Sequence, residues 1–176
     1  MTKIKWALDP THSEVNFKVK HLMITNVTGG FKSFQVEAES EGDDFTNASV
    51  SFSADVASIS TSNEQRDGHL KTGDFFEVEK FPTIKFQSTK FEKDGDDFLM
   101  EGNLTMKDVT APVKLNVEFG GIAKDSWGNI KAGFTVSGKL HRSDWGLSYN
   151  AALEAGGMVL SDEVKINAEI QMVKQA

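Results

Sequence analysis

Two short segments of the sequence combine charged residues with aromatic ones. Residues 66–76 read RDGHLKTGDFF, and residues 141–150 read HRSDWGLSYN. Aromatic side chains can shape an apolar mouth while Arg, Asp and His orient the polar head group of a ligand. Both segments are therefore candidate binding sites.

The same charges also have a purely structural interpretation. Arg66 with Asp67, and Arg142 with Asp144, can form ion pairs that tie a helix or loop onto one end of the fold. Charged side chains are rarely buried in proteins unless they are paired, so anchoring of this kind is common. The two interpretations are compatible, and the residues alone leave both open.

The sequence lacks the spacing that catalytic, metal and phosphate sites need. Its four histidines form no HExxH or HxH arrangement that would place two ligands on one face. It contains no GxSxG elbow, no cysteine and no glycine motif that would cradle phosphate. Carboxylate pairs such as Asp43 with Asp44 are typical of solvated turns. We therefore expect no catalytic residue, no metal and no cofactor.

Length and charge limit the class of protein and its partners. The chain has 176 residues, 39% of them hydrophobic, which suits a single domain over residues 1–176. Its 26 acidic and 19 basic residues give a net charge of −7, the wrong sign for binding nucleic acid. The first residues, MTKIKWALDP, carry no signal peptide, and no segment approaches the roughly 18 apolar residues of a membrane helix. We expect a cytoplasmic chain that spans no membrane, or a periplasmic one if a signal has been removed.

Period-two alternation of apolar and polar residues dominates the rest of the sequence and predicts half-buried strands. Clusters such as EGDD, KDGDD and DSWGN separate the alternating segments and are typical of hairpin turns. Eight segments alternate in this way: 15–19, 34–38, 48–56, 84–86, 100–106, 113–119, 134–140 and 164–172.

Only the segment around RDGHL departs convincingly from the strand pattern. Ser62 or Asn63 can cap the start of a helix, and Gly73 can end it. The sequence therefore predicts one helix of about three turns, with Asp74, Phe75 and Phe76 just beyond it.

Eight antiparallel strands and one short helix favour an all-β fold in which the sheet closes into a barrel, since closure removes exposed edges. Such a barrel either fills its interior or leaves room for one ligand. Small or flexible residues at in-facing positions fit a cavity, but they also occur where barrel strands bend. These residues are Ala54, Met100, Gly102, Met106, Gly138 and Ala168.

Four stretches, in order and over nearly the whole chain, resemble the YceI-like, lipid-binding family. They are WALDPTHSEVNFKVKHLMITNVTGGFKSF from residue 6, ISTSNEQRDGHLKTGDFFEVEKFPTIKFQS from residue 59, GNLTMKDVTAPVKL from residue 102, and HRSDWGLSYN from residue 141. The resemblance implies a lipocalin-like, eight-stranded antiparallel barrel around a long apolar tunnel. It also implies that the tunnel holds an amphiphile, and that members are often periplasmic and often homodimers.

The resemblance and the alternation together predict the residues that bind the ligand. The family's motif residues appear here as His21, Leu22, Arg66, His69, Leu70, Phe75, Phe76, Arg142 and Trp145, with Trp145 in place of the more usual Phe. The in-facing strand residues added to them are Phe17, Val19, Phe52, Phe86, Phe134 and Val136.

We therefore expect a carrier that binds, sequesters or transports a long-chain amphiphile and has no chemical step of its own. The ligand would be a polyisoprenoid, an isoprenoid quinone or a fatty-acid derivative. One alternative is an enzyme that modifies an isoprenoid or fatty amide, with His69 or His21 as acid or base. The other is an interaction module that binds a protein and no lipid.

Overall fold

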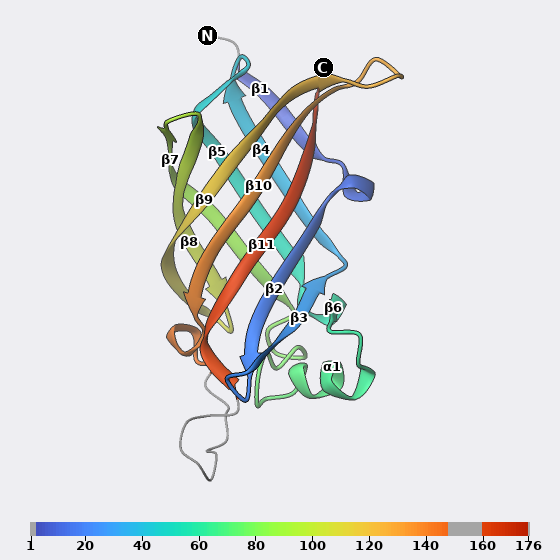
Figure 1. The fold of residues 1–176 in the computed structure, drawn as a ribbon, viewed down its shortest axis with the longest axis vertical. Coiled ribbons are helices and arrows are strands. Elements are labelled where there is room, and N and C mark those ends of the chain that lie inside the picture. The colour runs from blue at the N-terminus through green and yellow to red at the C-terminus, as the bar shows by residue number, and fades with distance from the viewer. Residues whose placement is uncertain (1–2, 148–159, 176) are drawn as a thin grey trace.

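The computed structural model describes residues 3–147 and 160–175, which form one antiparallel sheet and one α-helix (Figure 1). Three short 3₁₀ turns, Pro10–His12, Val56–Ser58 and Arg142–Trp145, interrupt or follow the strands, and α1 is Glu64–Leu70. The strands are β1 Lys3–Leu8, β2 Glu14–His21, β3 Thr25–Phe31, β4 Phe34–Glu41, β5 Asp44–Asp55, β6 Ile59–Ser60, β7 Thr83–Asp94, β8 Asp97–Met106, β9 Val109–Lys124, β10 Ile130–His141 and β11 Leu160–Lys174.

The eleven strand segments close into an eight-stranded antiparallel barrel, which confirms the predicted fold class. Three pairs of consecutive segments each act as one interrupted strand: β1 with β2, β3 with β4, and β5 with β6. In the sheet, β1 pairs with β4 and β2 pairs with β3. On the next side, β4 pairs with β5 and β3 pairs with β6. β11 closes the ring, since it pairs with β2 along Leu160–Glu169 and with β1 along Met172–Lys174.

β1 begins and β11 ends at the same end of the barrel (Figure 1). Aromatic side chains pack together inside this end. The ring centroid of Phe45 lies 4.9 Å from that of Phe134 and 5.1 Å from that of Trp6. The Trp6 indole N–H donates to the hydroxyl of Ser40 at 2.8 Å, so its polar atom is satisfied inside the core. This aromatic cluster consists of Trp6, Phe45, Phe91, Phe98, Phe119 and Phe134.

The other end of the barrel carries α1 (Figure 1). Within the described residues β6 pairs with β3 alone, and the β5–β7 ladder runs only from Ser51 to Asp55. α1 and residues 71–82 therefore connect two strands, β6 and β7, that form no hydrogen-bonded ladder with each other within the described residues, which is a break in the sheet. An apolar barrel interior next to such a break needs side chains from the helix and the loop to cover it.

The α-helix begins at a predicted cap but is shorter than predicted. The side chain of Asn63 accepts a hydrogen bond from the backbone N–H of Arg66 at 3.0 Å. The helix ends at Leu70, and the prediction that it extends to Gly73 is wrong. The following loop supplies the reason, because the N–H groups of Phe76 and Val78 donate to the carbonyls of Leu70 and Lys71 and turn the chain back.

Two in-facing glycines make room for large neighbours. A Cβ atom at Gly102 would lie 2.5 Å from the ring of Phe86, and one at Gly138 would lie 2.5 Å from a methyl carbon of Leu115. The space beside these glycines is therefore filled by side chains. Met100 and Met106 do line interior cavities.

Candidate ligand cavity

The largest interior cavity lies at the α1 end of the barrel and has a volume of about 350 Å³. This mouth cavity falls in the range of about 300–1,000 Å³ that is typical of small-molecule sites. It reaches the surface, because the exposed residues Arg66 and His69 belong to its lining. Its walls come from β2, β3, β7, β8, β10, β11, α1 and the loop after α1, and include Phe17, Val27, Phe31, Leu70, Phe75, Phe76, Leu140, Leu160 and Val164.

Two smaller cavities continue from the mouth cavity toward the aromatic cluster. The middle cavity has about 160 Å³ and shares Ile84, Met106 and Leu140 with the mouth cavity. The deep cavity has about 60 Å³, shares Val50 and Val136 with the middle cavity, and is lined by Phe45 of the aromatic cluster. The three cavities therefore form one column that narrows toward the closed end.

The column is long enough for an extended hydrocarbon chain. β11 contributes to all three cavities, with Val164 at the mouth and Met172 at the deep end. Eight residues of strand rise about 26 Å, or about 20 Å along the axis of a barrel whose strands tilt by 35–45°.

Polar side chains occur at only one end of this column. Every residue that lines the middle and deep cavities is apolar. The polar residues of the lining all belong to the mouth cavity: His21, Thr61, Arg66, His69 and Arg142. This distribution matches an amphiphile whose tail lies in the barrel and whose head group lies at the mouth.

Arg66 and Asp67 anchor α1 by sharing one threonine. Arg66 donates from Nε to the hydroxyl of Thr61 at 2.7 Å and from Nη2 to its carbonyl at 2.8 Å. Asp67 accepts from the N–H and the hydroxyl of Thr61. The two charged side chains thus hold α1 against the end of β6. They do so through hydrogen bonds to Thr61, whereas one expectation was a direct ion pair between Arg66 and Asp67.

Arg142 is buried at the mouth and is held by main-chain carbonyls. Its Nε donates to the carbonyl of Ser161 at 3.0 Å and its Nη1 to that of Leu147 at 2.6 Å. Burial lowers the pKa of the guanidinium from its ordinary value, and the nearby carboxylate of Asp162 opposes that shift. An arginine stays protonated in proteins, so a fixed positive charge lines the cavity. The expected ion pair with Asp144 is absent among the described residues.

The two histidines of the mouth lie on different elements. His69 of α1 contacts Asp74 at 2.8 Å between Nε2 and Oδ2, and both side chains are exposed. Its ring also meets the ring of Phe75 edge-on, with centroids 5.2 Å apart. His21 lies at the end of β2, opposite Leu160 of β11. A head group at the mouth would therefore meet imidazoles from two sides.

Most of the predicted binding residues line the column. Nine of them line the mouth cavity: Phe17, Val19, His21, Arg66, His69, Leu70, Phe75, Phe76 and Arg142. Phe52, Phe86 and Val136 line the middle cavity, and Phe134 lines the deep one.

Two of the predicted residues lie outside the lining of the column. Trp145 is 2% exposed, and its indole N–H donates to the carbonyl of Leu104 at 2.8 Å. This bond ties the turn after β10 to β8, which is a structural position. Leu22 lies in the exposed turn between β2 and β3.

Several lining residues were not predicted as part of the site. Thr61 follows a strand of two residues, which is too short to show alternation. Phe31 and Val27 belong to β3, whose sequence TNVTGGF has no clear period-two pattern. Met106, Leu140 and Ile166 did lie on predicted in-facing strand positions, so alternation could have identified them.

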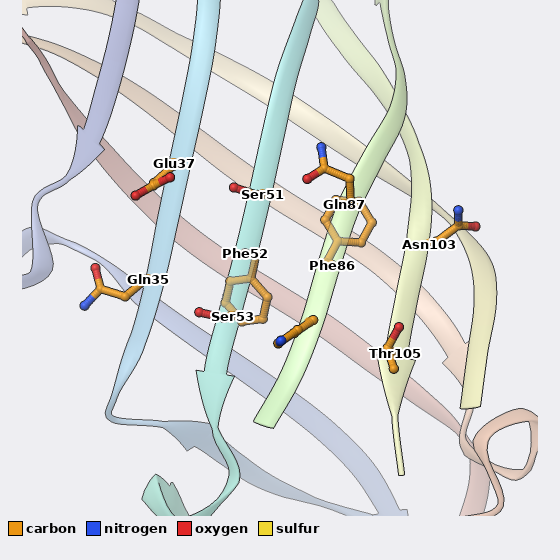
Figure 2. A pocket seen from close by; sticks show the side chains of 10 residues that line it. Gln35, Glu37, Ser51, Phe52, Ser53, Phe86, Gln87, Asn103 and Thr105 are labelled. Carbon is orange, nitrogen blue, oxygen red and sulfur yellow. The ribbon is translucent and has the colours of Figure 1, made fainter. Parts of the chain in front are cut away.

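A separate depression on the outer surface has a different character. It has about 520 Å³ and lies over β4, β5, β7 and β8, where Figure 2 shows Ser51, Ser53 and Gln87 on the neighbouring strands. These side chains alternate with Phe52 and Phe86, which line the middle cavity, so they point out of the barrel. An open polar surface of this kind offers no enclosure to an apolar tail.

Neither a metal site nor a membrane helix is found within residues 3–147 and 160–175. No group of three or more His, Asp or Glu residues in this part of the chain could hold a metal ion. No helix described here has the length and hydropathy needed to cross a membrane.

Known proteins resemble this chain over almost its full length. Residues 6–172 match the model of the YceI-like domain family. A UPF0312 protein from Staphylococcus aureus (strain N315) is 36% identical over 167 residues, which cover 94% of this chain and 95% of that protein.

Solved structures share the fold. A Campylobacter jejuni YceI protein has a TM-score of 0.78 at 33% identity, and the match covers 96% of this chain and 97% of that one. A polyisoprenoid binding domain from Saccharophagus degradans has a TM-score of 0.65 at 16% identity, with 97% and 98% of the two chains covered. At that identity the second likeness concerns the fold alone.

Proposed function

Because the chain belongs to the YceI-like domain family, we propose that it binds and carries a long-chain amphiphile inside its barrel. The ligand class is a polyisoprenoid, an isoprenoid quinone or a fatty-acid derivative. The observation that carries the proposal is the column of cavities, whose middle and deep parts are lined by apolar side chains alone and whose polar side chains all lie at the mouth. The polyisoprenoid binding domain from Saccharophagus degradans, which shares the fold, is an example of a barrel of this kind that binds a ligand of this class.

Affinity in this mechanism comes from the tail. Each methylene removed from water contributes about 0.8 kcal/mol, so a tail along the column gains well over 10 kcal/mol before costs are subtracted. Association costs about 4–15 kcal/mol in lost motion, and the tail alone can offset much of that. The chain therefore needs few polar contacts to hold its ligand.

Orientation and selectivity come from the mouth. Arg142 is held by two main-chain carbonyls, and Arg66 is held by Thr61, so both guanidiniums are in place before a ligand arrives. A positively charged mouth favours a head group with acceptor oxygens, such as a phosphate, carboxylate or quinone carbonyl. The column narrows from about 350 Å³ at the mouth to about 60 Å³ at its deep end, so the space left at the deep end limits how long a tail can be.

The experiment is extraction of the purified protein with organic solvent, followed by mass spectrometry of the extract. We expect one class of long-chain amphiphile in a fixed ratio to protein. Ala168→Phe places a ring in the middle cavity, where Ala168 is 6% exposed, and should lower the recovered lipid at least tenfold.

Asn167→Phe is the matched control, because Asn167 is the neighbouring residue of β11 and is exposed on the outside of the barrel. It should keep the lipid content of the wild type. The proposal fails if the wild type repeatedly yields no lipid, or if Ala168→Phe retains the same lipid in the same amount while folded by circular dichroism.

A further inference from the structure

Three consecutive large apolar side chains are exposed at the turn between β2 and β3. Leu22, Met23 and Ile24 are 38%, 52% and 78% exposed. The turn is tight, because the N–H of Ile24 donates to the carbonyl of His21 at 3.2 Å. Leu22 and Met23 have φ values of 54° and 61°, in the left-handed region that large side chains rarely adopt. A strained turn that presents apolar residues to water needs an explanation outside the fold itself.

This apolar turn lies at the rim of the mouth cavity. His21, immediately before it, lines the cavity, and so does Leu160, which pairs with His21. In Figure 1 the β2–β3 turn and α1 lie at the same end of the barrel, opposite the chain termini. The exposed apolar surface therefore continues directly into the apolar interior.

Charge around the turn favours a surface of phosphate groups. Between Asn16 and Phe31 the only lysines, arginines or acidic residues are Lys18 and Lys20, in a chain whose net charge is −7. Both lysines are exposed, and neither forms an ion pair with a described residue. On the neighbouring β11, the carboxylates of Asp162 and Glu163 already have partners in His141 and Lys139.

We propose that the β2–β3 turn docks this protein on the surface of a phospholipid bilayer, with Leu22, Met23 and Ile24 inserted at the level of the head groups. Lys18 and Lys20 then reach lipid phosphates, as lysines near membrane interfaces do. The mouth faces the lipid, and a long tail passes between bilayer and barrel without crossing water. This inference rests on the proposed function, because it describes how the same cavity is loaded and emptied.

A bilayer fits the turn better than a protein partner does. A stable protein complex buries about 1,200–2,000 Å² in total, far more than one hairpin tip supplies. A lipid surface needs only a small apolar insertion next to basic residues. The small size of the tip and the two lysines of β2 next to it therefore both favour lipid.

The structure supplies a matched control at the opposite end of the barrel. Trp127, in the turn between β9 and β10, is 85% exposed, and β9 and β10 meet at the end that holds the chain termini (Figure 1). Removal of this side chain takes away a large exposed apolar group and leaves the mouth unchanged. If exposed apolar side chains in general cause vesicle binding, changing Trp127 and changing the β2–β3 turn should both reduce it. If docking uses the β2–β3 turn, only the change in that turn should reduce it.

The test is flotation of the full chain with phosphatidylcholine vesicles, with and without phosphatidylglycerol. We expect the wild type and Trp127→Ser to partition equally, and the double variant Met23→Ser/Ile24→Ser to partition at least tenfold less. The single variant Ile24→Lys, which changes only the most exposed side chain of the turn, should also partition less than the wild type. Equal partitioning of the wild type and the folded turn variants overturns the inference. The inference is also overturned if the wild type binds no vesicles and differs from the turn variants only in being monomeric or dimeric, as measured by size exclusion with light scattering.

A second measurement separates docking from ligand binding. The rate at which a fluorescent geranylgeranyl alcohol passes from vesicles to protein should fall at least tenfold in the double variant. Its equilibrium binding from detergent solution should stay unchanged. Unchanged transfer with normal equilibrium binding overturns docking and leaves the proposed function standing. Vesicle binding by a wild type that takes up no amphiphile supports docking and contradicts the proposed function.

Discussion

A single carboxylate oxygen of Asp67 accepts two hydrogen bonds from Thr61, one from its N–H at 2.8 Å and one from its hydroxyl at 2.6 Å. Thr61 follows β6 and is 5% exposed, and Asp67 belongs to α1. Together with the two bonds from Arg66 to Thr61, these bonds tie the helix at the mouth to the end of β6. The charged part of RDGHLKTGDFF thus holds in place the helix whose Leu70 lines the mouth cavity.

Loss of the Asp67 carboxylate should loosen this end of the barrel. Asp67→Ala leaves the buried N–H of Thr61 without a partner, which costs about 1–3 kcal/mol in the free energy of unfolding. The amide of Phe76, which donates to the carbonyl of Leu70 at the end of α1, should also exchange faster with solvent. Urea unfolding and hydrogen exchange measure the two effects. Gln65→Ala, an exposed change on the same helix, should produce neither, and equal behaviour of the two variants would contradict this role.

Asp9 should make the barrel sensitive to acid. It is 8% exposed and lies between β1 and β2, where its carboxylate accepts from Nζ of Lys131 at 2.5 Å. The Lys131 hydrogen bond, followed by those from His12 and Thr11, holds the pKa of Asp9 well below its usual range, against the opposing effect of burial. Because the folded-state pKa is lowered, the stabilisation is fully present above the unfolded pKa of about 3.9 and is lost as pH falls further.

Asp9→Asn should lower the free energy of unfolding by about 3 kcal/mol at pH 7, since it breaks a buried pair. The gap between variant and wild type should shrink progressively below pH 4 in urea unfolding experiments. Asp43→Asn is the control, because the ion pair of Asp43 with Lys174 is exposed and should contribute under about 1 kcal/mol. A gap for Asp9→Asn that is the same at pH 7 and pH 3 would rule out the carboxylate as its source.

The depth of the column should set the length of the tail that fits. Phe134 lines the deep cavity, and its ring lies 4.9 Å from that of Phe45. Phe134→Ala should open space toward the aromatic cluster, so that longer isoprenoid tails are retained when a mixture of chain lengths is offered and analysed by mass spectrometry. The same change should cost about 3–5 kcal/mol in stability, because it leaves a cavity in the core.

Phe98→Ala is the matched control for chain length. Phe98 belongs to the same aromatic cluster and is 6% exposed, but it does not line the column. It should cost similar stability without any change in the tails retained. If both variants shift the retained length equally, general loosening of the core explains the effect and the deep cavity does not set the limit.

Much of the fold could be predicted because alternation is a local property of a strand. Residues two apart share a face, so runs such as Ala48, Val50 and Phe52 identify a strand and its buried side without any knowledge of its neighbours. Of the segments that were missed, β1 alternates over only six residues, and β3 and β6 show no clear alternation. β1 and β3 are completed by their pairing with other strands, and β6 has only two residues.

Position within the site could be predicted less well, because it depends on pairing between distant segments. Phe75 and Phe76 are adjacent, and on a strand they would face opposite ways. They both line the mouth cavity, because the chain turns repeatedly between Thr72 and Lys80. The family resemblance predicts Trp145 as a further binding residue, yet a hydrogen bond to Leu104, on a strand far away in sequence, holds it outside the column.

The sequence by itself determined an all-β chain of alternating strands with one short helix, a chemistry without catalytic motifs, and a resemblance that covers nearly every element. Only the tertiary structure decided which end of the barrel is open, how far the apolar column extends, and which charges stand at its mouth. Strand periodicity specifies the face of each residue but not the register between strands. The closure of β11 on β1 and β2, and the placement of α1 beside the break after β6, arise from contacts that no local pattern contains.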